Sequence, residues 1–321
     1  MTTRAERLAN QAPGVRLPAP AKLNLYLHVL GRRADGYHEL DSLIVFARHG
    51  DWLELRPAEA LTLEVTGPFA AALENQAPEH NIVMRAAREL AAWAARTGRP
   101  GPPGRPGLTA GAEMRLYKAL PVAAGLGGGS ADAAAALRGL LTLWQIELPA
   151  GELATLALRL GADVPACLAG RPTIVGGKGE HLRPLPTLPP LHFVMANPGP
   201  ALATGQVFAA LDQAAPSPVP TWPAPADARA LVAALAERRN DLEAPARRLV
   251  PDIAELLDRL AALPGCLLAR MSGSGASCFG LFAGAQAAAA AAAGAAHLSR
   301  QRPHWWIQAT ATAAPAAEAY G

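Results

Sequence analysis

The sequence predicts an α+β protein built as two lobes. Patterns typical of strands and of helices follow one another without the regular strand–helix–strand repeat of a doubly wound parallel sheet. The chain has 321 residues, a length that fits one large domain or two ordinary ones. Hydrophobic residues make up 51% of it, which is enough for a sizeable core and argues against global disorder.

The first elements are expected to be strands. In KLNLYLHV, residues 22–29, aliphatic side chains alternate strictly with others, which places Lys22 and Asn24 on the polar face of a half-buried strand. A turn follows in GRRADGY, where Asp35 precedes Gly36. The further elements expected in this half are strands at 40–46, 52–56, 61–65 and 113–116, a helix at 82–97 and a Pro/Gly-rich loop at 99–107.

The second half mixes helices with a few buried strands. A helix is expected over 130–144, and another over 152–160 stops at Gly161. The segment CLLARMSGSGASCFGLF, residues 266–282, has the pattern of two strands joined by a Gly/Ser turn. The further elements are a strand and turn at 171–185, a strand at 192–198, a Pro/Ala-rich loop at 214–226, helices at 227–238, 243–249, 252–262 and 285–297, and a strand at 304–310.

Composition disfavours two classes of partner. The net charge is +3 and the cations are scattered, so the basic patch of a nucleic-acid-binding protein is missing. No apolar run reaches the ~18 residues of a membrane span without Gly, Pro or a charge. The cysteines, Cys167, Cys266 and Cys278, are odd in number and lie in apolar surroundings, which predicts buried free thiols and a cytoplasmic location.

Lysine is rare in this chain. Of the 29 cations, only Lys22, Lys118 and Lys178 are lysine, so a compact point charge is a candidate requirement at each of these positions. Chance placement is the alternative. We read Lys178, in the sequence GGKGE, as a lysine in a hairpin turn.

The sharpest signal is PVAAGLGGGSADAAAAL, residues 121–137. Its glycines allow positive φ and leave room for close approach to the backbone. A helix follows, and a glycine loop that leads into a helix N-terminus is a phosphate site. Ser130 is placed to cap the helix or to ligate Mg²⁺. Asp132 is expected in the first helical turn, where a carboxylate simply complements the helix dipole.

Two familiar nucleotide loops do not fit this stretch. A P-loop requires a lysine after the last glycine, and none follows. A dinucleotide fingerprint requires G-x-G-x-x-G inside a strand–helix–strand unit, and both the spacing and the context are missing, which disfavours a dinucleotide-dependent oxidoreductase.

The stretch at 121–137 resembles the ATP-phosphate motif of the GHMP kinases, a superfamily of small-molecule kinases. PAPAKLNLYLHVLGRRADGYHELDSL and RMSGSGASCFGLF match further motifs in the expected order, and LGADVP, NPG and NDLE also fit. The resemblance extends from about residue 18 to residue 281. It implies an N-terminal ATP-binding lobe like domain 2 of ribosomal protein S5, over 1–172, and a C-terminal ferredoxin-like α/β-plait lobe for the substrate, over 173–321.

The resemblance assigns roles to residues of the donor and catalytic half. It implies that Asp163, in GADVP, is the catalytic aspartate and Lys22 the catalytic lysine, whereas a helix cap and a surface lysine are the alternatives. Asn81 is implied near adenine, or as the N-cap of the helix that follows it. The implied ATP-binding residues are Asn81, Lys118, Pro121, Val122, Ala123, Ala124, Gly125, Leu126, Gly127, Gly128, Gly129, Ser130 and Ala131. Ala123 and Ala124 stand where relatives often carry glycine.

The acceptor side follows from the same resemblance. The N-terminal stretch is similar to that of family members that phosphorylate the 2-hydroxyl of a cytidine diphosphate conjugate of methylerythritol, in the non-mevalonate route to isoprenoids. Aromatic faces stack a base and imidazole hydrogen-bonds its edge. The implied substrate-binding residues are Asn24, Tyr37, His38, Thr204, Phe208, Gly273 and Gly275.

The sequence therefore predicts an ATP- and Mg²⁺-dependent small-molecule kinase, a monomer or weak homodimer with no nucleic-acid or membrane partner. A kinase for homoserine or mevalonate is the nearest alternative, and the DGYH sequence favours a cytidine substrate over both. A protein that binds ATP without catalysis is a second alternative. The presence of Lys22 and Asp163 argues against it, because binding alone requires neither.

Overall fold

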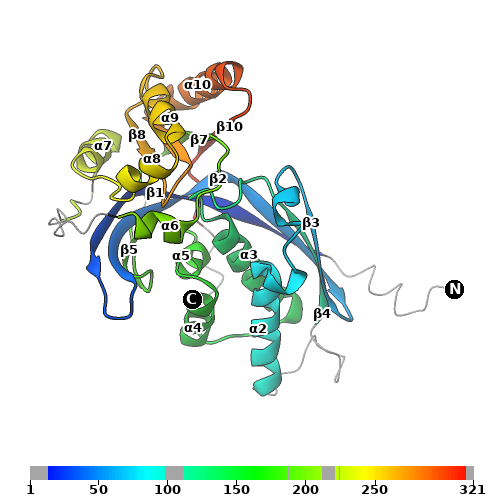
Figure 1. Ribbon diagram of the computed structural model, residues 1–321. Coiled ribbons are helices and arrows are strands. Elements are labelled where there is room, and N and C mark those ends of the chain that lie inside the picture. Colours follow the sequence, from blue (N-terminus) through cyan, green and yellow to red (C-terminus); the bar gives the residue numbers. More distant parts are fainter. Residues whose placement is uncertain (1–13, 98–110, 187, 212–220, 224, 316–321) are drawn as a thin grey trace.

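The computed structural model describes residues 14–97, 111–186, 188–211, 221–223 and 225–315 (Figure 1). The expected loop at 99–107 lies outside these residues, and the one at 214–226 is described only in part. The strands of the first sheet are β1 (Val15–Arg32), β2 (His38–Ala58), β3 (Leu61–Thr66), β4 (Gly111–Tyr117), β5 (Thr173–Gly177) and β6 (His181–Pro184). Their order is β3-β4-β2-β5-β6, with β1 paired to β2 along most of its length.

The long strand β2 replaces the two separate strands expected at 40–46 and 52–56. Pairing with β1 shifts register between Pro20 and Lys22, so residues 47–49 have no partner on β1, and it resumes where Pro20 lies opposite Gly50. A Cβ at Gly50 would lie 2.4 Å from the carbonyl oxygen of Ala19, so only glycine permits this close approach of the two strands. Gly50 therefore allows the two strands to lie this close together.

Helices cover one face of the first sheet (Figure 1). Their apolar sides and that face form one core, in which the small side chains of α3 allow close packing. The helices of this layer are α2 (Ile82–Arg96), α3 (Gly128–Trp144), α4 (Ala150–Leu160) and α5 (Val164–Ala169), and two short 3₁₀ helices, η1 (Ala70–Leu73) and η2 (Pro78–His80), precede α2.

The opposite face of the first sheet packs against a second, antiparallel sheet. Its order is β10-β7-β9-β8, built from β7 (Leu191–Asn197), β8 (Leu268–Met271), β9 (Cys278–Ala283) and β10 (Trp306–Ala311). Helices α8 (Glu243–Leu249), α9 (Asp252–Ala261) and α10 (Ala287–Gln301) contribute to the core on its outer face, with α6 (Thr204–Ala209) and α7 (Ala228–Ala236) beside it. The predicted two-lobed α+β class and the α/β-plait second lobe are thus confirmed.

The two sheets do not divide at residue 172. Strands β5 and β6 lie beyond it and pair within the first sheet, so the second sheet begins with β7 at Leu191. The division into domains at 172 and 173 stays a prediction.

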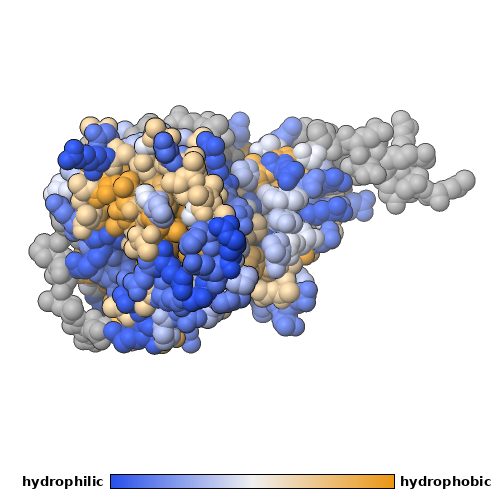
Figure 2. Space-filling model, turned by 90° about the horizontal axis from the view of Figure 1, so that it is seen from above, coloured by the Kyte–Doolittle hydropathy of each residue, from blue (hydrophilic) through white to orange (hydrophobic). Residues whose placement is uncertain are grey.

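Seen from above, apolar residues gather on the second lobe (Figure 2), where Figure 1 shows α9 and α10. Among the described residues, no helix is both long enough and apolar enough to span a bilayer.

Candidate active site

A cavity of about 1720 Å³ is lined by residues of both lobes. Typical small-molecule sites measure roughly 300–1,000 Å³, so this one has room for a nucleotide and a second ligand. Its walls come from β1 and β2, the loop at 121–127, the start of α2, helix α6 and the turn at 273–274. The residues that the sequence placed in a site therefore meet in one cavity, with the exceptions given below.

The glycine loop turns its carbonyl groups away from the cavity. Four successive carbonyl oxygens each accept a hydrogen bond from outside the loop. The acceptor–donor pairs are Ala123 with the Leu202 amide at 3.3 Å, Ala124 with the Ser277 amide at 3.1 Å, Gly125 with the Ser272 hydroxyl at 2.9 Å, and Leu126 with the Lys22 amide at 2.8 Å. Because the carbonyl oxygens, which would repel an anion, are bound elsewhere, the cavity side of the loop suits phosphate.

Helix α3 begins at Gly128, two residues before the expected start. Its N-cap, Gly127, has φ +63°, and no side chain caps the helix, so the N–H groups of the first turn keep their capacity for an anion. Of the thirteen residues assigned to ATP, Leu126 and Ala131 do not line the cavity, because both are buried in the core. The amide of Ala131 is also bound, to the carbonyl oxygen of Gly127 at 2.9 Å.

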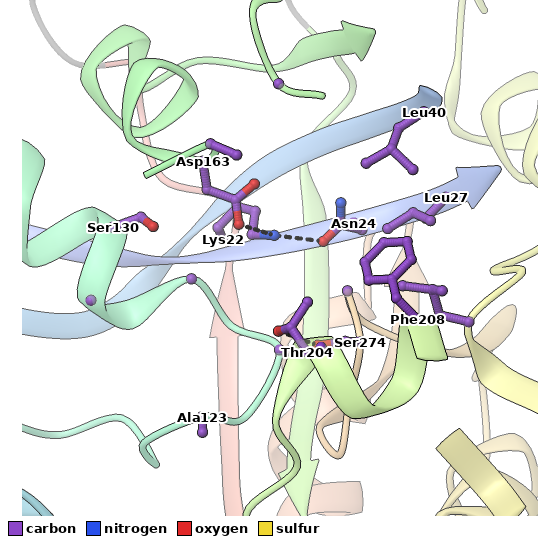
Figure 3. Close-up of a pocket in the computed structure, with 18 of the residues that line it drawn as sticks. Lys22, Asn24, Leu27, Leu40, Ala123, Ser130, Asp163, Thr204, Phe208 and Ser274 are labelled. Atoms are coloured by element: carbon purple, nitrogen blue, oxygen red, sulfur yellow. Dashed lines mark hydrogen bonds and ion pairs between the residues drawn. The ribbon is translucent and has the colours of Figure 1, made fainter. Parts of the chain in front are cut away.

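Lys22 lies between Asn24 and Asp163 (Figure 3). Its ammonium nitrogen is 3.0 Å from Oδ2 of Asp163 and donates to Oδ1 of Asn24 at 2.8 Å. Asn24 in turn donates to the hydroxyl of Ser42 at 2.8 Å, so its amide is oriented by a neighbouring strand. The strand alternation had placed Lys22 and Asn24 on one face, and both line the cavity.

Asp163 stands immediately before α5, and its carboxylate makes no capping hydrogen bond to that helix. The helix-cap alternative is therefore not observed. The Asp163 side chain is 40% exposed, whereas that of Lys22 is 5% exposed. A buried, fixed cation thus holds a carboxylate that remains open to a ligand in the cavity.

Lys118 is held by two carboxylates beneath the glycine loop. Its ammonium ion contacts Oδ2 of Asp51 and Oδ2 of Asp132, the latter at 2.7 Å. All three residues are buried, with exposed fractions of 2–3%. Burial lowers the pKa of Lys118, but the two carboxylates outweigh it and raise that pKa on balance.

The expected role of Asp132 as a simple complement of the helix dipole is wrong. The helix begins earlier than expected, so Asp132 lies beyond its first turn, and its carboxylate is buried against Lys118. Burial raises the pKa of the Asp132 carboxyl, and Asp51 adds to the rise while Lys118 opposes it. Oδ1 of Asp132 has no hydrogen-bond partner in the structure.

At the end of the cavity near α2, Asn81 caps that helix. Its Oδ1 accepts the amide of Val83 at 2.9 Å, as the N-cap alternative predicts. Asn81 also lines the cavity with Ile82 and Arg85. Its side-chain NH₂ group has no hydrogen bond among the described contacts and is therefore available to a ligand.

Aromatic residues from β2, the turn before it and α6 also line the cavity. The rings of His38 and Phe208 stack with centroids 4.7 Å apart and an interplanar angle of 22°. Burial, and then the charge of Arg32, lower the pKa of His38. Tyr37 is 57% exposed at the rim, as expected of a side chain free to contact a ligand.

The Gly/Ser turn of the second lobe contributes one of its two assigned glycines. Gly273 lines the cavity, and Ser274 beside it hydrogen-bonds Thr204 between their hydroxyl oxygens at 2.9 Å. Gly275 does not line the cavity. A Cβ there would lie 2.7 Å from the sulfur of Met271, so this glycine serves the packing of the turn.

Sequence reasoning missed three contributors to the site. Asp51 lies at an unremarkable strand position, and nothing local signals its pairing with Lys118. Ser272 holds the glycine loop from the second lobe. Lys178 occupies the expected hairpin turn but also lines the cavity, with its ammonium ion 4.7 Å from the centre of the Tyr37 ring and 3.7 Å from Asp35. The rarity of lysine was the available signal for Lys178.

The donor set for a metal ion is sparse. In the part of the chain that the structure describes, no group of three His, Cys, Asp or Glu side chains could hold one. Ser130 and Asp163 line the cavity and could each offer an oxygen. Mg²⁺ is commonly held by one or two protein oxygens together with substrate phosphates, so this set fits a metal that is carried by a nucleotide.

Comparisons with known proteins agree with this geometry. The models of the GHMP kinases N-terminal and C-terminal domains match residues 81–171 and 226–299. A crystal structure of a 4-(cytidine 5'-diphospho)-2C-methyl-D-erythritol kinase matches with a TM-score of 0.71 at 35% identity, and covers 94% of this chain and 100% of that chain. A homoserine kinase from Cytophaga hutchinsonii, at 17% identity and a TM-score of 0.66, shares the fold.

Curated relatives are more similar. The 4-diphosphocytidyl-2-C-methyl-D-erythritol kinase of Paramagnetospirillum magneticum is 54% identical over 294 residues, which cover 91% of this chain and 96% of the relative. That of Rhodospirillum rubrum is 51% identical and covers 91% of this chain and 90% of the relative. On this near full-length identity, the chain belongs to the 4-diphosphocytidyl-2-C-methyl-D-erythritol kinases, a family of GHMP kinases.

Proposed function

We propose that this chain transfers the γ-phosphoryl group of ATP to the 2-hydroxyl of 4-diphosphocytidyl-2-C-methyl-D-erythritol. The names of its relatives give the substrate class. One observation carries the proposal. The same cavity is lined by the glycine loop, whose carbonyl oxygens are hydrogen-bonded to other segments, and by the Lys22–Asp163 pair. An anion site next to a fixed carboxylate is what phosphoryl transfer to an alcohol requires.

The donor side rests on the glycine loop and the start of α3. ATP supplies the phosphoryl group, and Mg²⁺ on its phosphates neutralises charge that develops during transfer. The loop amides and the uncapped N-terminus of α3 would hold the phosphates, and Ser130 would add a hydroxyl oxygen for the metal. Asn81 would offer its amide nitrogens to the adenine.

The acceptor hydroxyl would be activated by Asp163. Its carboxylate accepts the proton as the oxygen attacks, and the contact with Lys22 at 3.0 Å holds the carboxylate in place beforehand. The same ammonium ion stabilises negative charge on the transferring group, from a buried position that needs no rearrangement. Catalysis would thus consist of positioning and electrostatics.

The aromatic residues of the cavity would bind the cytosine. Tyr37 is exposed, with Lys178 over its ring, and Phe208 of α6 stacks on His38; since both rings line the cavity, each would offer its remaining face to the base. His38 has a neutral imidazole near pH 7, because its pKa is lowered, and it can therefore donate and accept at the base edge.

We also propose that the protein is a monomer or a weak homodimer and that it acts in the cytoplasm.

A direct assay tests the proposal. Purified protein is mixed with ATP, Mg²⁺ and the cytidylated methylerythritol, and ADP release is followed, with homoserine and mevalonate as alternative acceptors. We expect turnover with the first acceptor alone. ADP release with homoserine or mevalonate, but not with the cytidine compound, would refute the substrate. ATP binding without turnover of any acceptor would favour a binding protein.

A further inference from the structure

The buried cluster of Asp51, Lys118 and Asp132 has no part in the chemistry proposed above. Buried charges are costly to desolvate, so three of them in one place call for a physical reason. One cation faces two carboxylates, which leaves a surplus acid inside the lobe, close to a loop whose expected ligand is an anion. Electrostatic attraction of ATP therefore does not explain the cluster.

The cluster joins the two ends of the glycine loop. Asp51 Oδ1, on β2, accepts the amides of Ala119 at 2.6 Å and Leu120 at 2.9 Å, directly before the loop begins at Pro121. Lys118, on the same segment, reaches across to Asp132, which lies on α3 directly after the loop. The ion pair therefore spans the loop from Lys118, in the segment before it, to Asp132, in the helix after it.

Contact with the loop itself is close. A Cβ added to Gly128, the first residue of α3, would lie 3.3 Å from both the ammonium nitrogen of Lys118 and Oδ2 of Asp51. The cluster thus packs under the turn of backbone where the loop passes into the helix. Lys118 lines the cavity, but its ammonium ion is already engaged by Asp51 and Asp132.

We propose that Asp51, Lys118 and Asp132 are positioning residues for the nucleotide, and that the Lys118–Asp132 pair closes the glycine loop into its phosphate-binding form. This inference rests on the proposed ATP site. It reassigns Lys118, which the family resemblance implied as a direct ATP contact, to a support beneath the loop. Asp132 becomes a determinant of nucleotide affinity that touches no ligand.

The test is calorimetric titration with a non-hydrolysable ATP analogue and Mg²⁺. Asp132→Ala removes the ion pair between Lys118 and Asp132 but keeps the one between Lys118 and Asp51. No buried charge is left uncompensated, so we expect this variant to fold. We expect its Kd to rise about tenfold, the effect of one lost charge-assisted hydrogen bond. Asp132→Asn keeps an oxygen acceptor for Lys118, and its Kd should stay within about twofold of wild type.

Controls separate the possible outcomes. Asp258→Ala removes an exposed carboxylate on α9 and should leave the Kd unchanged. If Lys118 contacts ATP directly, Asp132→Ala frees its ammonium ion and the Kd stays constant or falls, which overturns the proposal. Equal weakening by the Ala and Asn variants also overturns it, because charge alone would then matter.

Two further measurements complete the test. At saturating ATP, kcat/KM for the acceptor should change by less than about twofold in Asp132→Ala, since only the donor loop is affected. Asp132→Ser, whose hydroxyl is too short to reach Lys118, replaces the Ala variant should that one fail to fold. A wild-type protein that binds no analogue refutes the proposed ATP site itself, whereas normal wild-type binding with an unaffected variant refutes the positioning role alone.

Discussion

Replacing Lys118 with methionine should destabilise this protein strongly. The substitution keeps the aliphatic stem and removes the one cation between Asp51 and Asp132, whose side chains are 0% and 3% exposed. Removing one partner of a buried ionic cluster costs about 3–5 kcal/mol, because the remaining charge is left uncompensated. An unfolding entropy of ~2.1 cal/mol/K per residue gives about 0.7 kcal/mol/K for 321 residues, so Tm should fall by about 6 °C.

The assay is thermal unfolding by circular dichroism, with Asp132→Asn as the matched variant. Burial raises the pKa of Asp132 in the folded state, so its contribution to stability is present at low pH and is lost as pH rises through that raised value. Asparagine does not titrate. The Tm of the Asp132→Asn variant, relative to that of wild type, should therefore increase as the pH rises above about 4. A Lys118→Met protein with unchanged Tm, or a pH-independent difference, would refute this account of the cluster.

Four further outcomes are expected. Asp163→Ala should lower kcat by ~10²–10⁴, and retention within about tenfold in a steady-state assay would exclude a general base. Gly125→Val should sharply reduce Tm and soluble yield, because φ is +76° and a Cβ would lie 2.3 Å from a carbonyl oxygen; an unchanged Tm would contradict this. Ala123→Gly should raise the free energy of unfolding, measured by urea titration, by up to about 1 kcal/mol, because alanine is strained at φ +52°. A lower free energy of unfolding would argue against strain at this residue. Phe208→Ala should raise the inhibition constant of cytidine about tenfold through lost stacking, and an unaffected constant would remove Phe208 from the base site.

The local features of the site were predictable because they depend on near neighbours in the chain. Strict alternation put Lys22 and Asn24 on one strand face, and the structure finds them hydrogen-bonded there. A glycine run before an alanine-rich stretch predicted a loop that leads into a helix, and α3 begins within two residues of the expected position. The free state of the three cysteines also followed from their number and surroundings.

Other features could not be predicted because they depend on distant partners. Nothing next to Gly50 in the sequence indicates that β1 lies so close to it that only glycine fits. The sequence predicted Asp132 in the first helical turn, where a carboxylate complements the helix dipole, but the helix begins earlier and Asp132 lies beyond that turn. Its actual partner precedes the loop by several residues and is itself fixed by Asp51, from a third element.

The sequence by itself determined a glycine loop that leads into a helix and a strand face shared by Lys22 and Asn24. Each depends on residue type and local backbone freedom, which a single segment expresses. The roles of Lys22, Asp163 and the aromatic turn were implied by the family resemblance. Only the tertiary structure decided that the loop carbonyls are bound from three other segments, that Lys22 lies 3.0 Å from Asp163, and that Lys118 pairs with Asp132. These facts are properties of packed neighbours brought together across the fold, and the segments that supply them carry no signal of one another.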